Sequence, residues 1–127
     1  MLLRHVVFIT LSAMMLGAGV TAVGLARQQP GDSRRIPQFE NEHVKVWKSI
    51  IMPKQPLTMH RHEHPRALIA LAGGTMKIVQ KTGETEVANW ETGKAYWLTA
   101  DAPNTTHADV NDTDNPIEVI VVELKNP

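Results

Sequence analysis

Residues 54–74 of the chain read KQPLTMHRHEHPRALIALAGG, and they hold its densest group of chemically active side chains. Three of the six histidines stand there at alternate positions, namely His60, His62 and His64. In an extended strand, side chains two positions apart point the same way at about 6.8 Å. His60 and His62 can therefore converge on one metal ion. His64 lies about 13 Å from His60 and joins them only if the chain bends.

Short runs of β type surround this stretch. They are HVKVWKSII before it and RALIALAGG, TMKIVQK, TEVANW, AYWL and IEVIVVEL after its histidines. Turn sequences such as TGET and ETGK separate them, and no segment after residue 43 has a helical apolar period of useful length. Six or more short strands with frequent turns predict an all-β sandwich or barrel. We expect PNTTHADVN, which contains His107, and NDTDNP to be polar loops.

The N-terminal part of the chain differs from the rest. Residues 1–26 have a short basic start and a long apolar run, and no acidic residue precedes Asp32. This pattern predicts a secretory signal peptide, or an uncleaved anchor over residues 4–26, and therefore a periplasmic or secreted protein. A membrane is a partner only if the segment is not cleaved. Residues 27–41 are polar and predict a flexible leader, which leaves residues 42–127 for the barrel.

Charge and cysteine content exclude several classes of function. The chain has 13 basic and 13 acidic residues, so removal of residues 1–26, which contain one arginine and no acid, leaves 12 − 13 = −1. No basic stripe with interleaved aromatic residues is present, so nucleic acid is not an expected partner. There is no cysteine, which excludes thiol catalysis, disulfides and thiolate metal sites.

A third metal ligand must come from a distant part of the chain. His107 is a candidate because a barrel brings distant strands together on its inner wall. Three nitrogen ligands with open positions are the arrangement of catalytic metal sites. Imidazoles suit Fe, Zn, Cu and Ni, and the sequence does not choose among these divalent ions.

Residues 43–124 resemble the small single-domain cupins of the RmlC-like superfamily. The first cupin motif, G-x5-H-x-H-x(3,4)-E-x6-G, corresponds to residues 54–74, and the second, P-x-G-x-H-x3-N, corresponds to Pro103, His107 and Asn111. The resemblance implies a double-stranded β-helix (a jelly-roll barrel), metal ligands at His60, His62 and His107, and a homodimer.

The chain departs from the family pattern at one important position. The glutamate that completes the metal set of many cupins should fall at Arg66 or Ala67, and neither binds a cation. Two interpretations remain: a neutral three-histidine site, for which manganese is less favoured, or a site that has lost its metal. Glu63 and His64 are weaker ligand candidates if the strand bulges. Arg66 can instead bind a substrate carboxylate by paired hydrogen bonds.

Other polar and aromatic residues are assigned to structure. Tryptophans and a tyrosine in a small barrel are more often core than ligand pocket, and aspartates beside turns are usually turn formers. We therefore expect core positions for Trp47, Trp90, Tyr96 and Trp97, and turn formers at Asp109, Asp112 and Asp114.

Three functions fit these observations. The first is a metal-binding cupin that is a small-molecule metalloenzyme of oxygenase, isomerase or lyase type, acting on a polar or anionic substrate. The second is a metal-independent module that binds or senses an anion at Arg66. The third is a structural member of a periplasmic assembly. The intact histidines favour the first function and the missing glutamate favours the second; no catalytic residue is identified.

Overall fold

The computed structural model describes residues 31–127, so the predicted signal or anchor (1–26) lies outside the described part of the chain. Within that part there are eight β-strands and no helix long and apolar enough to cross a bilayer. The strands are β1 (Arg34–Glu40), β2 (Val44–Ile51), β3 (Arg66–Ala72), β4 (Gly74–Gln80), β5 (Thr85–Trp90), β6 (Ala95–Leu98), β7 (His107–Asn111) and β8 (Ile117–Leu124).

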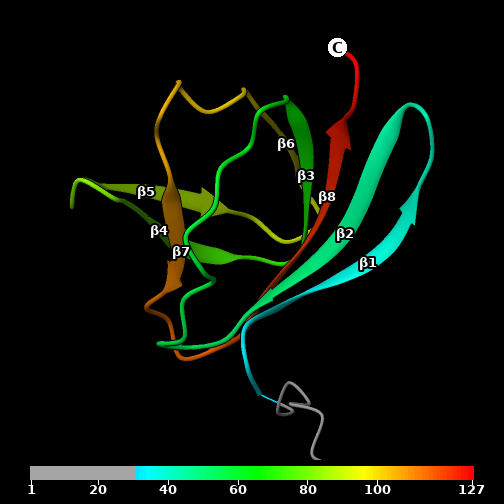
Figure 1. The fold of residues 1–127 in the computed structure, drawn as a ribbon. Coiled ribbons are helices and arrows are strands. Elements are labelled where there is room, and N and C mark those ends of the chain that lie inside the picture. Colours follow the sequence, from blue (N-terminus) through cyan, green and yellow to red (C-terminus); the bar gives the residue numbers. More distant parts are fainter. Residues whose placement is uncertain (1–30) are drawn as a thin grey trace, which may run out of the picture.

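The strands form two antiparallel sheets. The larger sheet has the order β1-β2-β8-β3-β6 and the smaller has the order β5-β4-β7. Figure 1 shows the two sheets on opposite sides of the domain, joined by the segment between β2 and β3 and by the turns at their ends. The predicted all-β class, with six or more strands, is confirmed.

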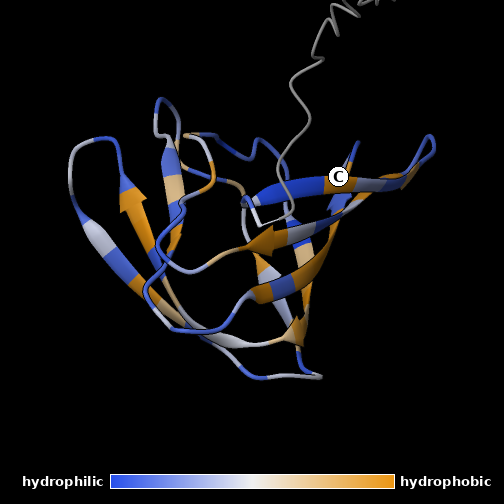
Figure 2. Cartoon of the chain, turned by 90° about the horizontal axis from the view of Figure 1, so that it is seen from below, coloured by the Kyte–Doolittle hydropathy of each residue, from blue (hydrophilic) through white to orange (hydrophobic). Residues whose placement is uncertain are grey.

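The inner face of the larger sheet follows from residue alternation along its strands. Trp47, Ser49 and Ile51 of β2 are buried, and each lies opposite an odd-numbered residue of β8 in the antiparallel register, such as Val119 or Val121. Directly paired residues share one face of a sheet, so these side chains form one wall of the core. Figure 2 shows the resulting change between hydrophobic and hydrophilic residues along the strands.

The segment that carries the first histidines runs beside β7 and extends the smaller sheet. The amide of Leu57 donates to the carbonyl of Asp109 at 3.1 Å. His60 and His107 exchange two backbone hydrogen bonds, each of 2.9 Å, and form an isolated antiparallel bridge. Two histidines that are 47 positions apart in the sequence are therefore direct neighbours.

Two predictions about local structure are wrong. Residues 34–40, which lie within the predicted leader, form the edge strand β1, paired with β2. Pro37 is compatible with this because proline is tolerated on edge strands, and the register shifts just after it. The second error concerns residues 107–111: the expected polar loop is the strand β7, which pairs with β4. Its buried side chains include His107 and Asn111, which are polar, so the usual pattern of a strand is absent from its sequence.

Candidate functional site

His60, His62 and His107 come together at one end of the space between the two sheets. Their ring centroids lie 5.0 Å (His60–His62), 4.5 Å (His60–His107) and 5.7 Å (His62–His107) apart. One ligand nitrogen from each ring lies within 4.8 Å of the others, so the group could hold a metal ion. The prediction that His60 and His62 converge, and that His107 joins them from a distant part of the chain, is confirmed for the positions of the three rings.

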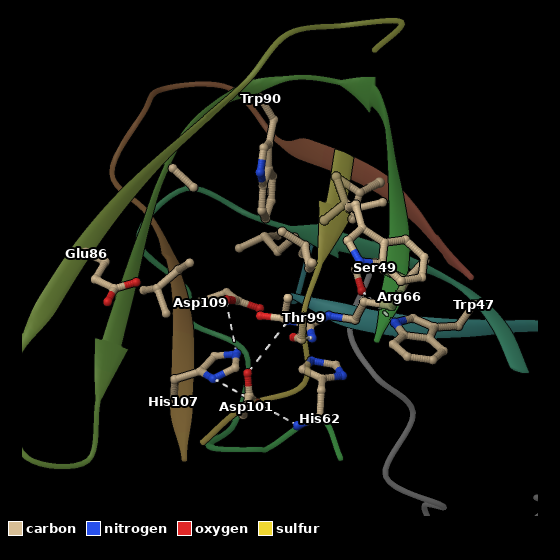
Figure 3. A pocket seen from close by; sticks show the side chains of 18 of the residues that line it. Trp47, Ser49, His62, Arg66, Glu86, Trp90, Thr99, Asp101, His107 and Asp109 are labelled. Atoms are coloured by element: carbon tan, nitrogen blue, oxygen red, sulfur yellow. Dashed lines mark hydrogen bonds and ion pairs between the residues drawn. The ribbon is translucent and has the colours of Figure 1, made fainter. Parts of the chain in front are cut away.

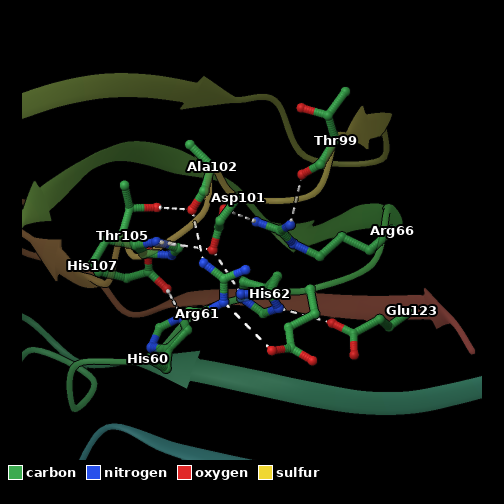
Figure 4. Close-up of polar contacts among 12 residues, drawn as sticks. His60, Arg61, His62, Arg66, Thr99, Asp101, Ala102, Thr105, His107 and Glu123 are labelled. Carbon is green, nitrogen blue, oxygen red and sulfur yellow. Dashed lines mark hydrogen bonds and ion pairs between the residues drawn. The ribbon is translucent and has the colours of Figure 1, made fainter.

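His62 is held by the loop that follows β6. Its amide donates to Oδ2 of Asp101 at 2.7 Å, and the amide of Asp101 donates to the carbonyl of His62 at 2.8 Å (Figure 4). Arg61 next to it donates to the carbonyl of Ala102 at 2.8 Å. This pairing fixes a segment that has no regular secondary structure, and it places His62 against β7.

Each of the three imidazoles has an oxygen at Nδ1. The partner of His60 is the carbonyl of Thr58 at 2.7 Å, and that of His62 is Oε2 of Glu123 at 2.9 Å. Oδ2 of Asp101 lies 3.4 Å from Nδ1 of His107. A neutral imidazole that donates from Nδ1 keeps its lone pair on Nε2, which is the nitrogen then free to bind a metal.

The Nε2 atom of His60 gives a direct test of whether a metal fits. It is buried and has no hydrogen-bond partner among the described residues. A buried polar atom without a partner is costly and rare in folded proteins, whereas a metal ion would satisfy its lone pair. The donor set is also suitable, since three imidazoles are typical ligands of divalent transition metals.

Burial favours the neutral forms of His60 and His62. It is the main cause that lowers the pKa of His60, and it lowers the pKa of His62 to about 2, with the nearby cation of Arg66 adding to the effect. Burial also raises the pKa of Glu123. The contact between His62 and Glu123 has the geometry of an ion pair, but with so low a pKa His62 is a neutral donor. We therefore treat the contact as a hydrogen bond from Nδ1–H to the carboxylate.

A cavity of about 320 Å³ opens beside the histidines (Figure 3). His62 and His107 lie at its edge, and the ring of Trp47 stacks on that of His62 at 5.9 Å and an angle of 4°. Trp90, Leu68 and other apolar residues form the far wall. This volume is at the small end of ligand pockets, which indicates a small molecule.

Arg66 points into this cavity. Its side chain is buried, Nη1 donates to the carbonyl of Thr99 at 3.1 Å, and Nη2 lies 4.0 Å from Oδ1 of Asp101. Burial is the main cause that lowers its pKa from 12.5, with the carboxylates of Asp101 and Glu123 acting in the opposite direction. Its position is therefore that of a cation facing a cavity, as the binding of an anion requires.

Glu63 and His64, the weaker ligand candidates, do not join the three-histidine group. Glu63 is exposed and forms an ion pair with Arg61 at 3.6 Å. His64 lies near Glu123 and acts to lower the pKa of that carboxyl group. It does not belong to the group of ligand atoms formed by His60, His62 and His107. The chain does not bulge in the way that would bring either side chain inward.

Several charged residues around the site are not predicted by the sequence pattern. Asp109 was expected to form a turn but belongs to β7, and its carboxylate lies 3.6 Å from Nε2 of His60. The guanidinium of Arg35, in the supposed leader, lies 4.9 Å from the ring centroid of Trp47 and lines the cavity. The aromatic prediction holds for Trp47 and Trp90, which are buried, but it is wrong for Trp97, which is 60% exposed.

Comparisons with known proteins agree with this architecture. No family model matches the chain, and no curated protein is found that is similar to it. Among solved structures, it is similar to a cupin domain from Bordetella pertussis Tohama I, with 19% identity, 78% of this chain and 99% of that chain covered, and a TM-score of 0.65.

Two further structures point the same way. A RmlC-like cupin family protein with a double-stranded β-helix fold from Methanocaldococcus jannaschii has 16% identity over 80% of this chain and 87% of its own, with a TM-score of 0.58. An uncharacterized conserved protein with a double-stranded β-helix domain from Klebsiella pneumoniae has 19% identity over 77% and 81%, with a TM-score of 0.57.

At these identities the likeness shows the fold alone. The chain therefore has the double-stranded β-helix fold that these cupins share, and the resemblance carried by its two histidine motifs is confirmed at the level of the fold.

Proposed function

We propose that the protein binds a divalent transition metal, Fe, Zn, Cu or Ni, through His60, His62 and His107. The observation that carries this proposal is the orientation of the three imidazoles. Each Nδ1 has an oxygen partner, and Nε2 of His60 is buried without one among the described residues. Such oxygen partners hold metal-binding histidines in one tautomer and one ring orientation.

We propose further that the site acts on a small polar or anionic molecule, as an enzyme of oxygenase, isomerase or lyase type. A bound ion would supply Lewis-acid chemistry or, for a redox-active metal, electron transfer. The chain itself contributes Arg66, whose buried guanidinium can hold a carboxylate by charge-assisted hydrogen bonds. Trp47 and Trp90 contribute apolar walls, which exclude water from the bound molecule.

The experiment is metal analysis of protein purified without a histidine tag. We expect near-stoichiometric metal in the wild type and a sharp loss in His60→Ala and in His107→Ala. His43→Ala is the matched control, because His43 is exposed and pairs only with Glu42 at 3.2 Å among the described ion pairs. Full retention of metal in both site variants would refute the assignment.

A metal-independent module that binds or senses an anion is the second candidate function. It is favoured by the two arginines, Arg35 and Arg66, that line the cavity. If the protein binds no iron, zinc, copper or nickel after reconstitution, and calorimetry shows that small carboxylates bind the wild type but not Arg66→Ala, this candidate replaces the first.

We also propose that the protein is a homodimer. Both edge strands of the larger sheet carry an exposed aromatic residue, Phe39 of β1 at 59% and Trp97 of β6 at 60%. Edge strands with exposed apolar side chains readily pair with another chain, and a second copy paired at one of these two edges would cover the ring on that edge. Light scattering should give twice the monomer mass for the wild type and a lower mass for Phe39→Ser or Trp97→Ser. A monomeric wild type would refute the proposal.

Export is a separate proposal. It is supported by the apolar run of residues 1–26 with its basic start. Cell fractionation, together with the intact mass of the recovered protein, tests it. A mass lacking about 26 residues indicates a cleaved signal, full length in the membrane fraction indicates an anchor, and full length in the cytoplasm refutes export.

A further inference from the structure

The carboxylate of Asp109 faces the same ring nitrogens that the proposed metal would occupy. Oδ2 lies 3.6 Å from Nε2 of His60, and Oδ1 lies 3.9 Å from Nε2 of His107. Both distances exceed the 2.7–3.2 Å of an ordinary N–H···O hydrogen bond. Two atoms that each bind one ion at about 2.0–2.2 Å can be no more than about 4.3 Å apart. The two distances are therefore too long for hydrogen bonds and short enough for Asp109 to share an ion with His60 and His107. The ligand atoms that lie within 4.8 Å of one another belong to the three histidines and not to Asp109, so the carboxylate has to turn toward His62 when the ion binds.

We propose that Asp109 is the fourth protein ligand of the metal site, giving a set of three imidazoles and one carboxylate. This inference rests on the proposed metal binding by the three histidines and adds a residue to that site. The carboxylate comes from β7 of the smaller sheet, two positions after His107.

The surroundings of Asp109 support this role. Its side chain is 16% exposed, and among residues 31–127 its ion-pair contacts are with the two imidazoles and with no lysine or arginine. A largely buried carboxylate without a directly paired cation is costly. A metal ion between Asp109 and the rings would compensate that charge and would also satisfy the unpartnered Nε2 of His60.

The backbone holds Asp109 in this position. Its carbonyl accepts from the amide of Leu57 at 3.1 Å on one side of β7, and it pairs with Ile78 of β4 on the other. Because side chains alternate along a strand, His107 and Asp109 point to the same face. A ligand on a strand that is paired on both sides is held more firmly than one on a loop.

The added carboxylate changes the expected metal preference. Three neutral imidazoles carry no charge, and on that basis manganese was disfavoured. An anionic oxygen ligand makes the site harder and adds Mn²⁺ to the ions already within its range, because carboxylates suit Mn²⁺ better than imidazoles alone do.

The test compares Asp109→Asn with the wild type in the full chain, using Zn²⁺ and Co²⁺ as probes. Asparagine keeps the shape of the side chain and removes its charge. Asp112→Asn is the matched control, since Asp112 lies three positions further on and forms ion pairs with Lys54 and Lys77 outside the site. Zinc affinity is measured by competition with a chelator, cobalt coordination by its visible absorption spectrum, and folding by circular dichroism.

We expect Asp109→Asn to weaken zinc binding more than about 100-fold, beyond the range of residues that only orient a ligand, and to change the cobalt spectrum. Asp112→Asn should match the wild type in both measurements. An unchanged cobalt spectrum in Asp109→Asn overturns the assignment, whatever the change in affinity. If the wild type binds neither ion, the proposed function fails and this inference fails with it. Should Asp109→Asn not fold, Asp109→Ser is measured in the same way.

Discussion

Glu123 is the residue whose removal most directly tests how the site is built. Its carboxylate accepts from Nδ1 of His62 at 2.9 Å, and the two side chains are only 19% and 7% exposed. Replacing it by alanine removes a hydrogen bond to a charged group, an interaction of roughly 1.5–3 kcal/mol. It also frees His62 to rotate or to change tautomer, which moves the proton to the nitrogen that the metal needs.

The loss of zinc affinity in Glu123→Ala also follows from the known effect of residues that orient metal ligands. Removal of a residue that orients a metal ligand typically lowers metal affinity about 10–100-fold, which corresponds to about 1.4–2.7 kcal/mol. The two ranges agree, so we expect zinc affinity to fall by about 100-fold in Glu123→Ala. We expect a fall of about 10-fold in Glu123→Gln, because the amide oxygen can still accept from Nδ1–H but has no charge.

The assay is a chelator competition with zinc, carried out beside thermal unfolding of the metal-free protein. Glu118→Gln is the control, because Glu118 lies on the same strand but on its other face, 3.2 Å from Lys48. Metal-free Glu123→Ala should unfold several degrees lower than the wild type, since it leaves a buried donor unsatisfied. Wild-type zinc affinity in both Glu123 variants would refute the orienting role, and an equal loss in Glu118→Gln would show that the effect is not specific.

Three other predictions concern the fold around the site. Asn111→Ala should lower the free energy of unfolding in urea by about 2–4 kcal/mol. The side-chain amide of Asn111 is fully buried and donates to the carbonyls of Ile51 at 2.9 Å and Asn115 at 2.7 Å, which would lose this donor. A loss below about 1 kcal/mol would contradict this role. Gly73→Ala should fail to fold or melt at a far lower temperature, because the added Cβ would lie 2.0 Å from the backbone carbonyl oxygen of Trp90. Gly74→Ala is the control, because its nearest contact, at 2.9 Å, is with the end of the Ile117 side chain, which can move. Equal melting temperatures of the two variants would exclude the backbone clash. A hydrogen bond from Lys77 lowers the pKa of Asp112, so this ion pair stabilises the fold above the ordinary carboxyl pKa and stops doing so as pH falls through the lowered pKa of Asp112. Asp112→Asn should therefore melt at a different temperature from the wild type at pH 7 and at the same temperature in acid. An equal difference at both pH values would contradict the stabilising role of the Lys77–Asp112 ion pair.

The strands could be predicted because their composition is visible in local sequence. β2 and β8 are rich in valine and isoleucine, and the short turns between strands contain glycine or asparagine. The edge strand β1 could not be recognised in the same way. Its sequence, RRIPQFE, has few apolar residues, and it becomes a strand through pairing with β2.

One further residue of the site, Asp109, could have been predicted from strand alternation. Once residues 107–111 are treated as a strand, a period of two places His107, Asp109 and Asn111 on one face, so Asp109 could have been a candidate ligand. The error was to treat a polar segment as a loop. A strand whose inner face lines a metal site carries polar residues inward, which is the reverse of the usual core pattern.

Glu123 and Asp101 could not have been found from the sequence. Glu123 lies opposite Arg66 only because β8 pairs with β3 in one register, and alternation does not say which face of β8 is inside. Asp101 reaches His62 and His107 from an irregular loop that has no periodicity at all. Both depend on contacts between residues that are distant in the chain.

The charges around the cavity bear on the choice between the two candidate functions. Three acidic and two basic side chains line it, namely Glu86, Asp101 and Asp109 with Arg35 and Arg66, and a fourth carboxylate, that of Glu123, accepts from His62 at its edge. With the histidines left out, the formal charge of these six side chains is 2 − 4 = −2. An anion would enter an unfavourable field in the metal-free protein, whereas one divalent ion makes the surroundings neutral and leaves Arg66 to attract the anion. The arginine that stands where a carboxylate was expected thus favours a metal-dependent site, in which anion binding follows metal binding. Calorimetry with a small carboxylate should detect binding only after the metal is loaded, and equal binding to the metal-free protein would favour the anion module instead.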